Sequence, residues 1–404
     1  MKSKELFRLN IGLQSLAIFR NLLKDPVIAA LREYLEDLEA GETARSVSRY
    51  AGFVSAFYAA GTPAFSRYVE RIVGDDENPC IRLIGRGETP SSEMARCVAG
   101  ELEILQAVAS LTPSQLRQGL DWDGYLPEFP TEPVDVVASY RQRCENIGQY
   151  GYGIYARHPM FYISGENQIV PVHNPDKIRL SSLIDYKREQ QIILDNTMAL
   201  LSGKPAANIL LTGDAGTGKS STVKAVVNEL SHLGLRILEV RKEQLHSIPA
   251  ILDELNSNPL KFILFIDDLS FQKDDDNFSA LKAILEGSVS ARSRNVVIYA
   301  TSNRRHLVKE SFSNRDGDDV HRNDTMQEML SLSERFGIQI TFQSRTRKPT
   351  WILSATWQKT GVWKCPWKNW KLRRSGLLWA GADGPPGPPP SSSTACWQNK
   401  NANA

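Results

Sequence analysis

A glycine-rich octapeptide carries the clearest chemical signal in the sequence. Residues 213–220 read GDAGTGKS and fit G-x-x-x-x-G-K-[ST], in which glycines let the backbone wrap around phosphate oxygens with its N–H groups pointing inward. A strand-like apolar run at 208–212 precedes this loop, and a helical segment at 220–230 follows it. Since the N-terminus of a helix attracts anions, the arrangement predicts a phosphate site.

The last two residues of this loop have separate predicted roles. Lys219 would place a cation at the β- and γ-phosphates of a nucleotide, and Ser220 would offer its hydroxyl to Mg²⁺. The alternative is a glycine-rich turn before a helix. The residues expected to bind the phosphate-bearing cofactor are Gly213, Asp214, Ala215, Gly216, Thr217, Gly218, Lys219, Ser220 and Ser221.

Two acids follow the apolar run that begins at Phe262. Asp267 is expected to hold Mg²⁺, directly or through water, and Asp268 sits where a general base could polarise an attacking water. Two acids at the end of a strand are usually a solvated turn. Their position 48 residues after Lys219, in the same predicted sheet, favours the catalytic interpretation.

Asn303 and Arg335 complete the set of candidate catalytic residues. Asn303 ends another buried strand, 295–303, and could reach a γ-phosphate or the attacking water; alternatively it caps a helix that begins at Arg304. Arg335 lies in LSLSERFG (330–337), just before the last strand. An arginine at the end of a helix can act on the nucleotide of a neighbouring subunit, or it can pair with the helix C-terminus.

The surrounding pattern predicts the sheet that positions these residues. From residue 180, near-continuous apolar runs alternate with helical segments, which is typical of a parallel sheet covered on both faces. The expected strands are Asn208–Thr212, Arg236–Val240, Phe262–Asp267, Val296–Ala300 and Ile338–Phe342.

The ordered motifs resemble those of AAA+ ATPases. The finer match is to a bacterial family of AAA+ ATPases of unknown function, through YKREQ (186–190), Asn196-Thr197, GDAGTGKSS (213–221), FILFIDDLSF (262–271), LKAILEGS (281–288), YATSNRRHLV (299–308) and SLSERFG (331–337). The resemblance covers about residues 180–342. It implies an α/β P-loop fold with a five-stranded parallel core in 5-1-4-3-2 order. It also implies ATP and Mg²⁺ as cofactors, a ring-like or dimeric homo-oligomer, and adenine contacts from Leu183 to Gln190. Asp267-Asp268-Leu269 is similar to helicase-loader ATPases.

Two departures from the AAA+ pattern matter. Most AAA+ enzymes carry Glu where Asp268 stands, and the shorter side chain would need the water closer, which predicts slow turnover. No aromatic-glycine pore loop follows the run at 236–240, which argues against polypeptide threading.

Four regions are expected along the 404 residues. Residues 1–155 read as a helical accessory domain without a catalytic constellation, and 156–179 as a hairpin or linker containing strand-like runs at Met160–Ile163 and Gln168–Val172. Residues 180–342 form the ATPase core. Residues 343–404 are an irregular basic tail.

The tail differs sharply in composition from the rest. It holds seven of the eight tryptophans, ten Lys or Arg and one acid, where an AAA+ protein would have a helical lid. It could bind single-stranded nucleic acid, act as a Pro-rich linker or ligand, or be read out of frame from about residue 344. We favour the third, which the coding DNA would test. A core without a lid predicts weak ATP binding and poor hydrolysis.

Bulk properties limit the remaining possibilities. Residues 1–342 hold 38 basic and 45 acidic residues, which gives no support for bulk nucleic-acid binding. No apolar run predicts a membrane span, and five scattered cysteines without a signal peptide favour reduced thiols in the cytoplasm.

The sequence therefore predicts a Mg²⁺-dependent ATPase that couples nucleotide state to conformation and acts on an unknown protein or DNA client. Two alternatives stay open. One is a nucleotide-gated, DNA-associated loader-like binding module with little turnover, and the other is a lid-less inactive remnant.

Overall fold

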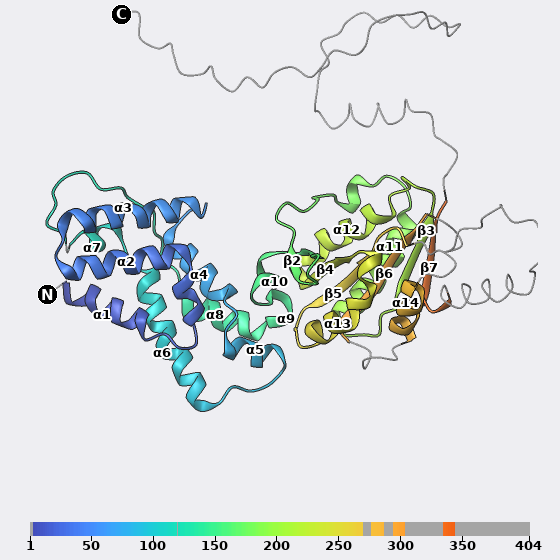
Figure 1. Ribbon diagram of the computed structural model, residues 1–404, viewed down its shortest axis with the longest axis horizontal. Coiled ribbons are helices and arrows are strands. Elements are labelled where there is room, and N and C mark those ends of the chain that lie inside the picture. Colours follow the sequence, from blue (N-terminus) through green and yellow to red (C-terminus); the bar gives the residue numbers. More distant parts are fainter. Residues whose placement is uncertain (1–2, 119, 270–275, 287–293, 304–333, 344–404) are drawn as a thin grey trace, which may run out of the picture. The chain divides into compact units, whose positions relative to one another are not determined.

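Helices build the first part of the chain, as the apolar spacing predicts. The computed structural model describes residues 3–118, 120–269, 276–286, 294–303 and 334–343 (Figure 1). The helices that precede the sheet are α1 (Ser3–Gln14), α2 (Pro26–Ala40), α3 (Thr43–Ala59), α4 (Phe65–Asp75), α5 (Pro79–Gly85), α6 (Ser92–Ala109), α7 (Pro113–Arg117), α8 (Val136–Glu145), α9 (Ile147–Tyr150) and α10 (Ile154–Arg157).

Side-chain caps fix the starts of several of these helices. The hydroxyl of Ser91 accepts the N–H of Met94 at the start of α6, and Thr112 forms a capping box at the start of α7. At α2, the Asp25 carboxylate accepts the backbone N–H groups of Val27 and Ile28, which have no partner within the helix.

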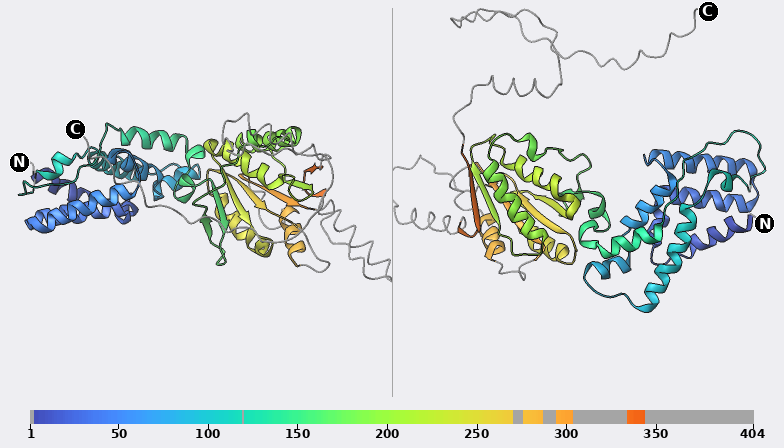
Figure 2. Two further views of the ribbon diagram at one scale, coloured as in Figure 1. Left: turned by 90° about the horizontal axis from the view of Figure 1, so that it is seen from above. Right: turned by 180° about the vertical axis from the view of Figure 1, so that it is seen from behind.

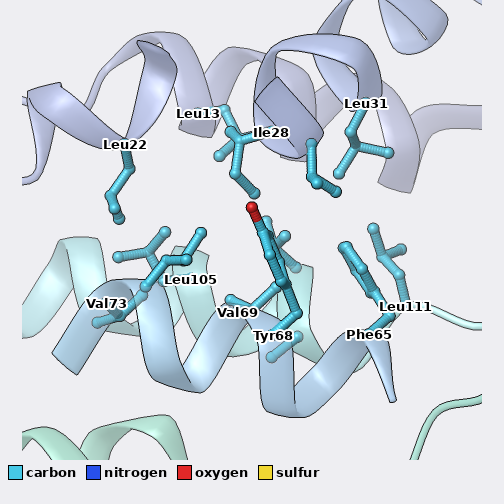
Figure 3. Close-up of a cluster of buried hydrophobic side chains, with 14 of the residues drawn as sticks. Leu13, Leu22, Ile28, Leu31, Phe65, Tyr68, Val69, Val73, Leu105 and Leu111 are labelled. Carbon is cyan, nitrogen blue, oxygen red and sulfur yellow. The ribbon is translucent and has the colours of Figure 1, made fainter. Parts of the chain in front are cut away.

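One apolar cluster joins helices α1 to α9. Phe65, Val69 and Val73 recur at helical spacing on α4, and Figure 3 shows Val73 near Leu22 and Leu105 and Phe65 near Leu111. All of these side chains are buried, so this stripe of α4 is a central contact of the helical region. The apolar core residues of this cluster run from Leu6 to Tyr152.

A buried carboxylate closes the connection after α1. Glu101, only 7% exposed, accepts the backbone N–H groups of three consecutive residues, 17–19, over 2.9–3.1 Å. Buried N–H groups need an acceptor, and a charged one gives stronger bonds. Glu101 therefore supplies the acceptors that a helix or a neighbouring strand would otherwise provide for these three N–H groups.

Among the described residues, the second part of the chain is built on a seven-stranded sheet. Its strands are β1 (Met160–Ile163), β2 (Ile169–Pro171), β3 (Ile209–Gly213), β4 (Leu235–Val240), β5 (Lys261–Ile266), β6 (Val296–Ser302) and β7 (Ile338–Phe342). Their spatial order is β2-β1-β4-β5-β6-β3-β7, and every neighbouring pair is parallel except β1 with β2.

The five-stranded core has the expected topology. Numbered by sequence within the core, β7-β3-β6-β5-β4 is the order 5-1-4-3-2, which confirms the predicted fold class. The sheet is larger than predicted, because the hairpin expected as a linker adds β1 beside β4 and β2 at the edge.

Helices cover both faces of this sheet (Figure 2). The covering helices are α11 (Lys187–Leu201), α12 (Lys219–Leu230), α13 (Ile248–Asn256) and α14 (Asp276–Glu286). Strand β5 shows the two-residue alternation that this layering requires. Ile263 and Phe265 pack in the cluster containing α11 and α12, whereas Phe262, Leu264 and Ile266 pack in the cluster containing α13 and α14.

The register places the carboxyl ends of the central strands together. Gly213 lies opposite Phe342, Thr212 opposite Ser302, and Ile266 opposite Ala300. Residues that follow β3, β5 and β6 therefore meet at the carboxyl end of the sheet, where ligands bind in open α/β sheets. In the ranges that the structure covers, no helix has both the length and the apolar character to cross a membrane.

Candidate nucleotide site

The loop after β3 has the backbone that its glycines predict. Gly213 has a φ of 143°, and a Cβ there would lie 2.2 Å from the carbonyl oxygen of Phe342 on the neighbouring strand. A side chain is therefore excluded by both conformation and space. Gly216 and Gly218 also have positive φ, and Gly218 is the N-cap of α12. The loop consequently ends at a helix N-terminus, as an anion site requires.

Lys219 is held at the centre of this loop. Its ammonium group donates to the carbonyls of Gly213 (2.8 Å) and Asp214 (2.9 Å) and to Oδ1 of Asn303 (2.9 Å). The residue is only 6% exposed. Burial lowers the pKa of Lys219, and the carboxylates of nearby acids, Asp267 first among them, act in the opposite direction.

Ser220 and Asp267 form a second pair of contacts beside the lysine. The Ser220 hydroxyl donates to Oδ1 of Asp267 over 2.6 Å, and both residues are half-buried. Because that hydroxyl donates its proton to the carboxylate, its lone pairs stay available to a cation. This is the juxtaposition that the sequence predicted for a magnesium site.

Asp268 has an uncommon backbone conformation. Its φ is 54°, in the left-handed region that only glycine, Asn and Asp adopt at low cost. Its side chain is exposed, and its Oδ1 accepts from the Nδ2 of Asn303 over 2.7 Å. Asn303 thus contacts Lys219 through its oxygen and Asp268 through its nitrogen.

Thr301 is a site residue that sequence reasoning missed. Buried to 2% exposure on β6, it donates its hydroxyl proton to Oδ1 of Asp267 over 2.5 Å and accepts the backbone N–H of Asp268 over 2.9 Å. One available signal was its position two residues before Asn303, which puts both side chains on the same side of a strand.

Arg335 does not join this group. It precedes β7, whose first residue, Ile338, lies opposite Ile209 at the amino end of β3. Five residues of strand, about 16 Å, separate that end from the phosphate loop. In this chain, Arg335 therefore lies at the amino end of the strands, whereas Lys219 lies at their carboxyl end.

Tyr186, in the segment expected to contact adenine, lies beside the phosphate loop. The ring of Tyr186 packs on that of Phe342, with centroids 4.8 Å apart, and its hydroxyl donates to the carbonyl of Gln343 over 2.7 Å. Since Phe342 pairs with Gly213, Tyr186 lies close to the first glycine of the loop.

The remaining sequence predictions concern residues outside the described ranges. They include the helix that could begin at Arg304, the helix before Arg335, and the three interpretations of the tail beyond Gln343. The expectation that the lid is missing also concerns those residues.

The strand order and the loop-helix geometry define a P-loop module of the AAA+ type. The chain belongs to the family described as "Protein of unknown function (DUF815)", whose profile matches residues 156–387. This match confirms the predicted resemblance to an AAA+ family of unknown function. The matched range includes β1 and β2 and continues past Phe342 into the tail.

Solved structures give weaker likenesses. A structure titled "Crystal Structure of the DnaI" is 18% identical, with a TM-score of 0.30, over 47% of this chain and 97% of that one. A structure titled "Structure of C. elegans PCH-2" is 19% identical, with a TM-score of 0.32, over 46% of this chain and 52% of that one. No curated protein sequence matches this chain.

Proposed function

We propose that this protein is an ATP-binding, Mg²⁺-dependent ATPase of the AAA+ type that couples nucleotide binding and hydrolysis to conformational change in a client. One observation carries the proposal. The start of α12, the residues after β5 and the residue after β6 bring Lys219, Ser220, Asp267, Asp268 and Asn303 together, and Thr301 links their contacts into one hydrogen-bond network at the carboxyl end of the sheet.

The phosphate loop supplies the binding chemistry. Lys219 can exchange its contacts with two backbone carbonyls for phosphate oxygens, while the N–H groups at the start of α12 face the same anion. A phosphate would also favour the charged form of this buried lysine, because opposite charge raises its pKa.

The donor set fits Mg²⁺. Ser220 and Asp267 present oxygen atoms, which hard divalent cations prefer. In the part of the chain that the structure describes, no group of three or more His, Cys, Asp or Glu could hold a metal ion. Such a sparse site suits Mg²⁺, which is usually held by one or two protein groups together with substrate phosphates and water. When bound, Mg²⁺ would neutralise charge on the β- and γ-phosphates.

Asp268 and Asn303 are placed to act on the attacking water. Asp268 is exposed, and its carboxylate is oriented by the Asn303 amide, so it can accept a hydrogen bond from water. Asn303 also contacts Lys219, so one amide can respond both to the γ-phosphate and to the base. Asp reaches less far than Glu, which supports slow turnover.

Arg335 supports a homo-oligomer. Arg335 lies at the amino end of the strands and the phosphate loop lies at their carboxyl end. Arg335 can therefore reach a nucleotide only if that nucleotide is bound to another subunit. We expect Arg335→Ala to lose ATPase activity, and an equimolar mixture with Lys219→Ala to recover part of it. Wherever the two variants are neighbours, the intact phosphate site of an Arg335→Ala subunit would meet the intact arginine of a Lys219→Ala subunit. Full activity of Arg335→Ala alone would contradict this role.

Phosphate release provides the test of the proposed function. Wild-type protein should release phosphate from ATP in Mg²⁺ and not in EDTA, and Ser220→Ala should need at least about tenfold more Mg²⁺ for half-maximal rate, as expected for loss of a buried polar contact. Ser257→Ala, in an exposed turn after α13, is the control. Mg²⁺-independent hydrolysis, or none at all, would contradict the proposal. Activity that requires single-stranded DNA and falls steeply with salt would identify DNA as the client.

A further inference from the structure

An exposed aromatic loop projects from the helical region, far along the sequence from the nucleotide site. It comprises residues 121–125, Asp-Trp-Asp-Gly-Tyr, between α7 and α8. Trp122 is 50% exposed and Tyr125 is 86% exposed. Tryptophan is highly buried in most folded proteins, so two large aromatic side chains in one short exposed segment require an explanation.

The chain that follows this loop is anchored. Leu126 and Phe129 are buried in the helical core. Arg117 donates to the carbonyl of Leu126 over 2.8 Å, and the Tyr50 hydroxyl donates to the carbonyl of Pro127 over 2.9 Å. The exposure of the loop is therefore a feature of the fold, because the backbone beside it is fixed by buried groups.

The Trp122 indole is held in one orientation by its own loop. A Cβ on Gly124 would lie only 2.3 Å from the indole, so the ring packs directly on the glycine backbone. Its N–H donates to the carbonyl of Tyr125 over 3.4 Å. An exposed ring that is already ordered loses little entropy when a partner covers it.

A third exposed aromatic residue is tied to the chain just after this loop. Tyr58, on α3, is 56% exposed, and its hydroxyl donates to the carbonyl of Glu128 over 2.7 Å. That bond ties the Tyr58 ring to the segment directly after the loop. Trp and Tyr are the residues most enriched among the strong contacts of protein interfaces.

The charge of the loop identifies the kind of partner. Asp121 and Asp123 flank Trp122, and both are exposed. Among the described residues, neither acid forms an ion pair. Acids would repel the phosphates of nucleic acid and of anionic lipids, whereas a basic group can contact a carboxylate and an aromatic face together.

We propose that Trp122, Tyr125 and Tyr58, with Asp121 and Asp123, form a docking surface for a Lys- and Arg-rich segment of a partner protein. The aromatic rings contact the cationic side chains and their aliphatic stems, and the carboxylates pair with the charges. This proposal does not depend on nucleotide binding, so its failure would leave the ATPase proposal intact.

Fluorescence anisotropy with a labelled peptide tests this surface. The probe is a 12-residue peptide of Arg, Lys and Ser, and the neutral probe has Gln in place of each basic residue. Full-length wild type should bind the basic probe, and Trp122→Ala/Tyr125→Ala should bind it at least about tenfold more weakly, as expected for aromatic interface anchors. Phe7→Ala, which removes an exposed aromatic ring on α1, should bind like wild type.

Two further variants separate charge from ring contact. Asp121→Asn/Asp123→Asn should weaken binding and reduce its salt dependence, and Gly124→Ala should weaken binding by displacing the indole. The ten basic residues of the tail are the same in every variant, so differences report the loop. Circular dichroism verifies that each variant is folded.

Two results would contradict this proposal. Equal binding of the basic probe by wild type and Trp122→Ala/Tyr125→Ala would overturn the proposal, as would no preference for the basic over the neutral probe. Binding to lipid vesicles or single-stranded DNA that is lost in Trp122→Ala/Tyr125→Ala would assign the surface to another class of partner.

Discussion

The Thr301 hydroxyl donates to Oδ1 of Asp267 over 2.5 Å, joining the end of β6 to the candidate magnesium ligand that directly follows β5. The same hydroxyl accepts the backbone N–H of Asp268, whose φ is 54°. A single buried side chain therefore fixes both adjacent acids, one through its carboxylate and the other through its backbone.

Replacing Thr301 by valine tests this positioning role. Valine keeps the shape but leaves Asp267 without one donor and the Asp268 N–H without its acceptor, which lets the candidate base move. We expect kcat to fall at least about tenfold, since misplacement of catalytic groups by about 1 Å is costly, while KM changes less. Thr301→Ser should keep most activity, because it retains the hydroxyl. Wild-type kcat in Thr301→Val would refute the role.

Asp268→Asn separates catalysis from stability. Asn tolerates the left-handed conformation as well as Asp does, so the melting temperature should stay within about 2 °C of the wild type. ATP affinity should be retained, whereas kcat should fall about 10²-fold or more if the carboxylate acts as a general base. Unchanged turnover would show that another group accepts the proton.

A buried acid in the helical region predicts a measurable pH dependence of stability. Asp76 is 5% exposed and accepts from Asn78, and burial raises its pKa from 3.8 to about 6. Its contribution to stability is full below pH 3.8 and is lost as the pH rises through about 6, because the folded state then holds a buried charge.

Asp76→Asn should remove this dependence. Relative to the wild type, the variant should gain about 2–3 kcal/mol in free energy of unfolding between pH 4 and pH 7. Urea unfolding followed by circular dichroism measures it, with the exposed Glu88→Gln as control. Parallel pH profiles for the wild type and Asp76→Asn would show that Asp76 does not titrate in this range.

The sequence predicted the five core strands of the sheet, but not that β1 and β2 extend the sheet beside β4. The apolar runs that became β3 to β7 are long and bounded by turn residues, so their type was readable, and the AAA+ resemblance supplied their order. The strands β1 and β2 were expected only as a hairpin. Their docking beside β4 depends on long-range pairing of Met160 with Ile237, which local pattern does not encode.

The candidate site was readable where chemistry depends on residue type and spacing. The loop, the two acids and Asn303 follow such rules, and the structure brings them together. Two features of the site could be recognised only from the structure. The left-handed backbone of Asp268 has no signal in an Asp-Asp pair, and the role of Thr301 comes from the pairing of β5 with β6.

Equilibrium binding of ATP tests the central claim most directly. Titration of a fluorescent ATP analogue in Mg²⁺ should give saturable binding to the wild type, and Lys219→Ala should bind at least about tenfold more weakly, because charge-assisted contacts to phosphate are lost. Lys224→Ala, on the same helix but paired with Glu239, should bind like the wild type. Equal affinity of Lys219→Ala and the wild type, or no binding by either, would contradict the account.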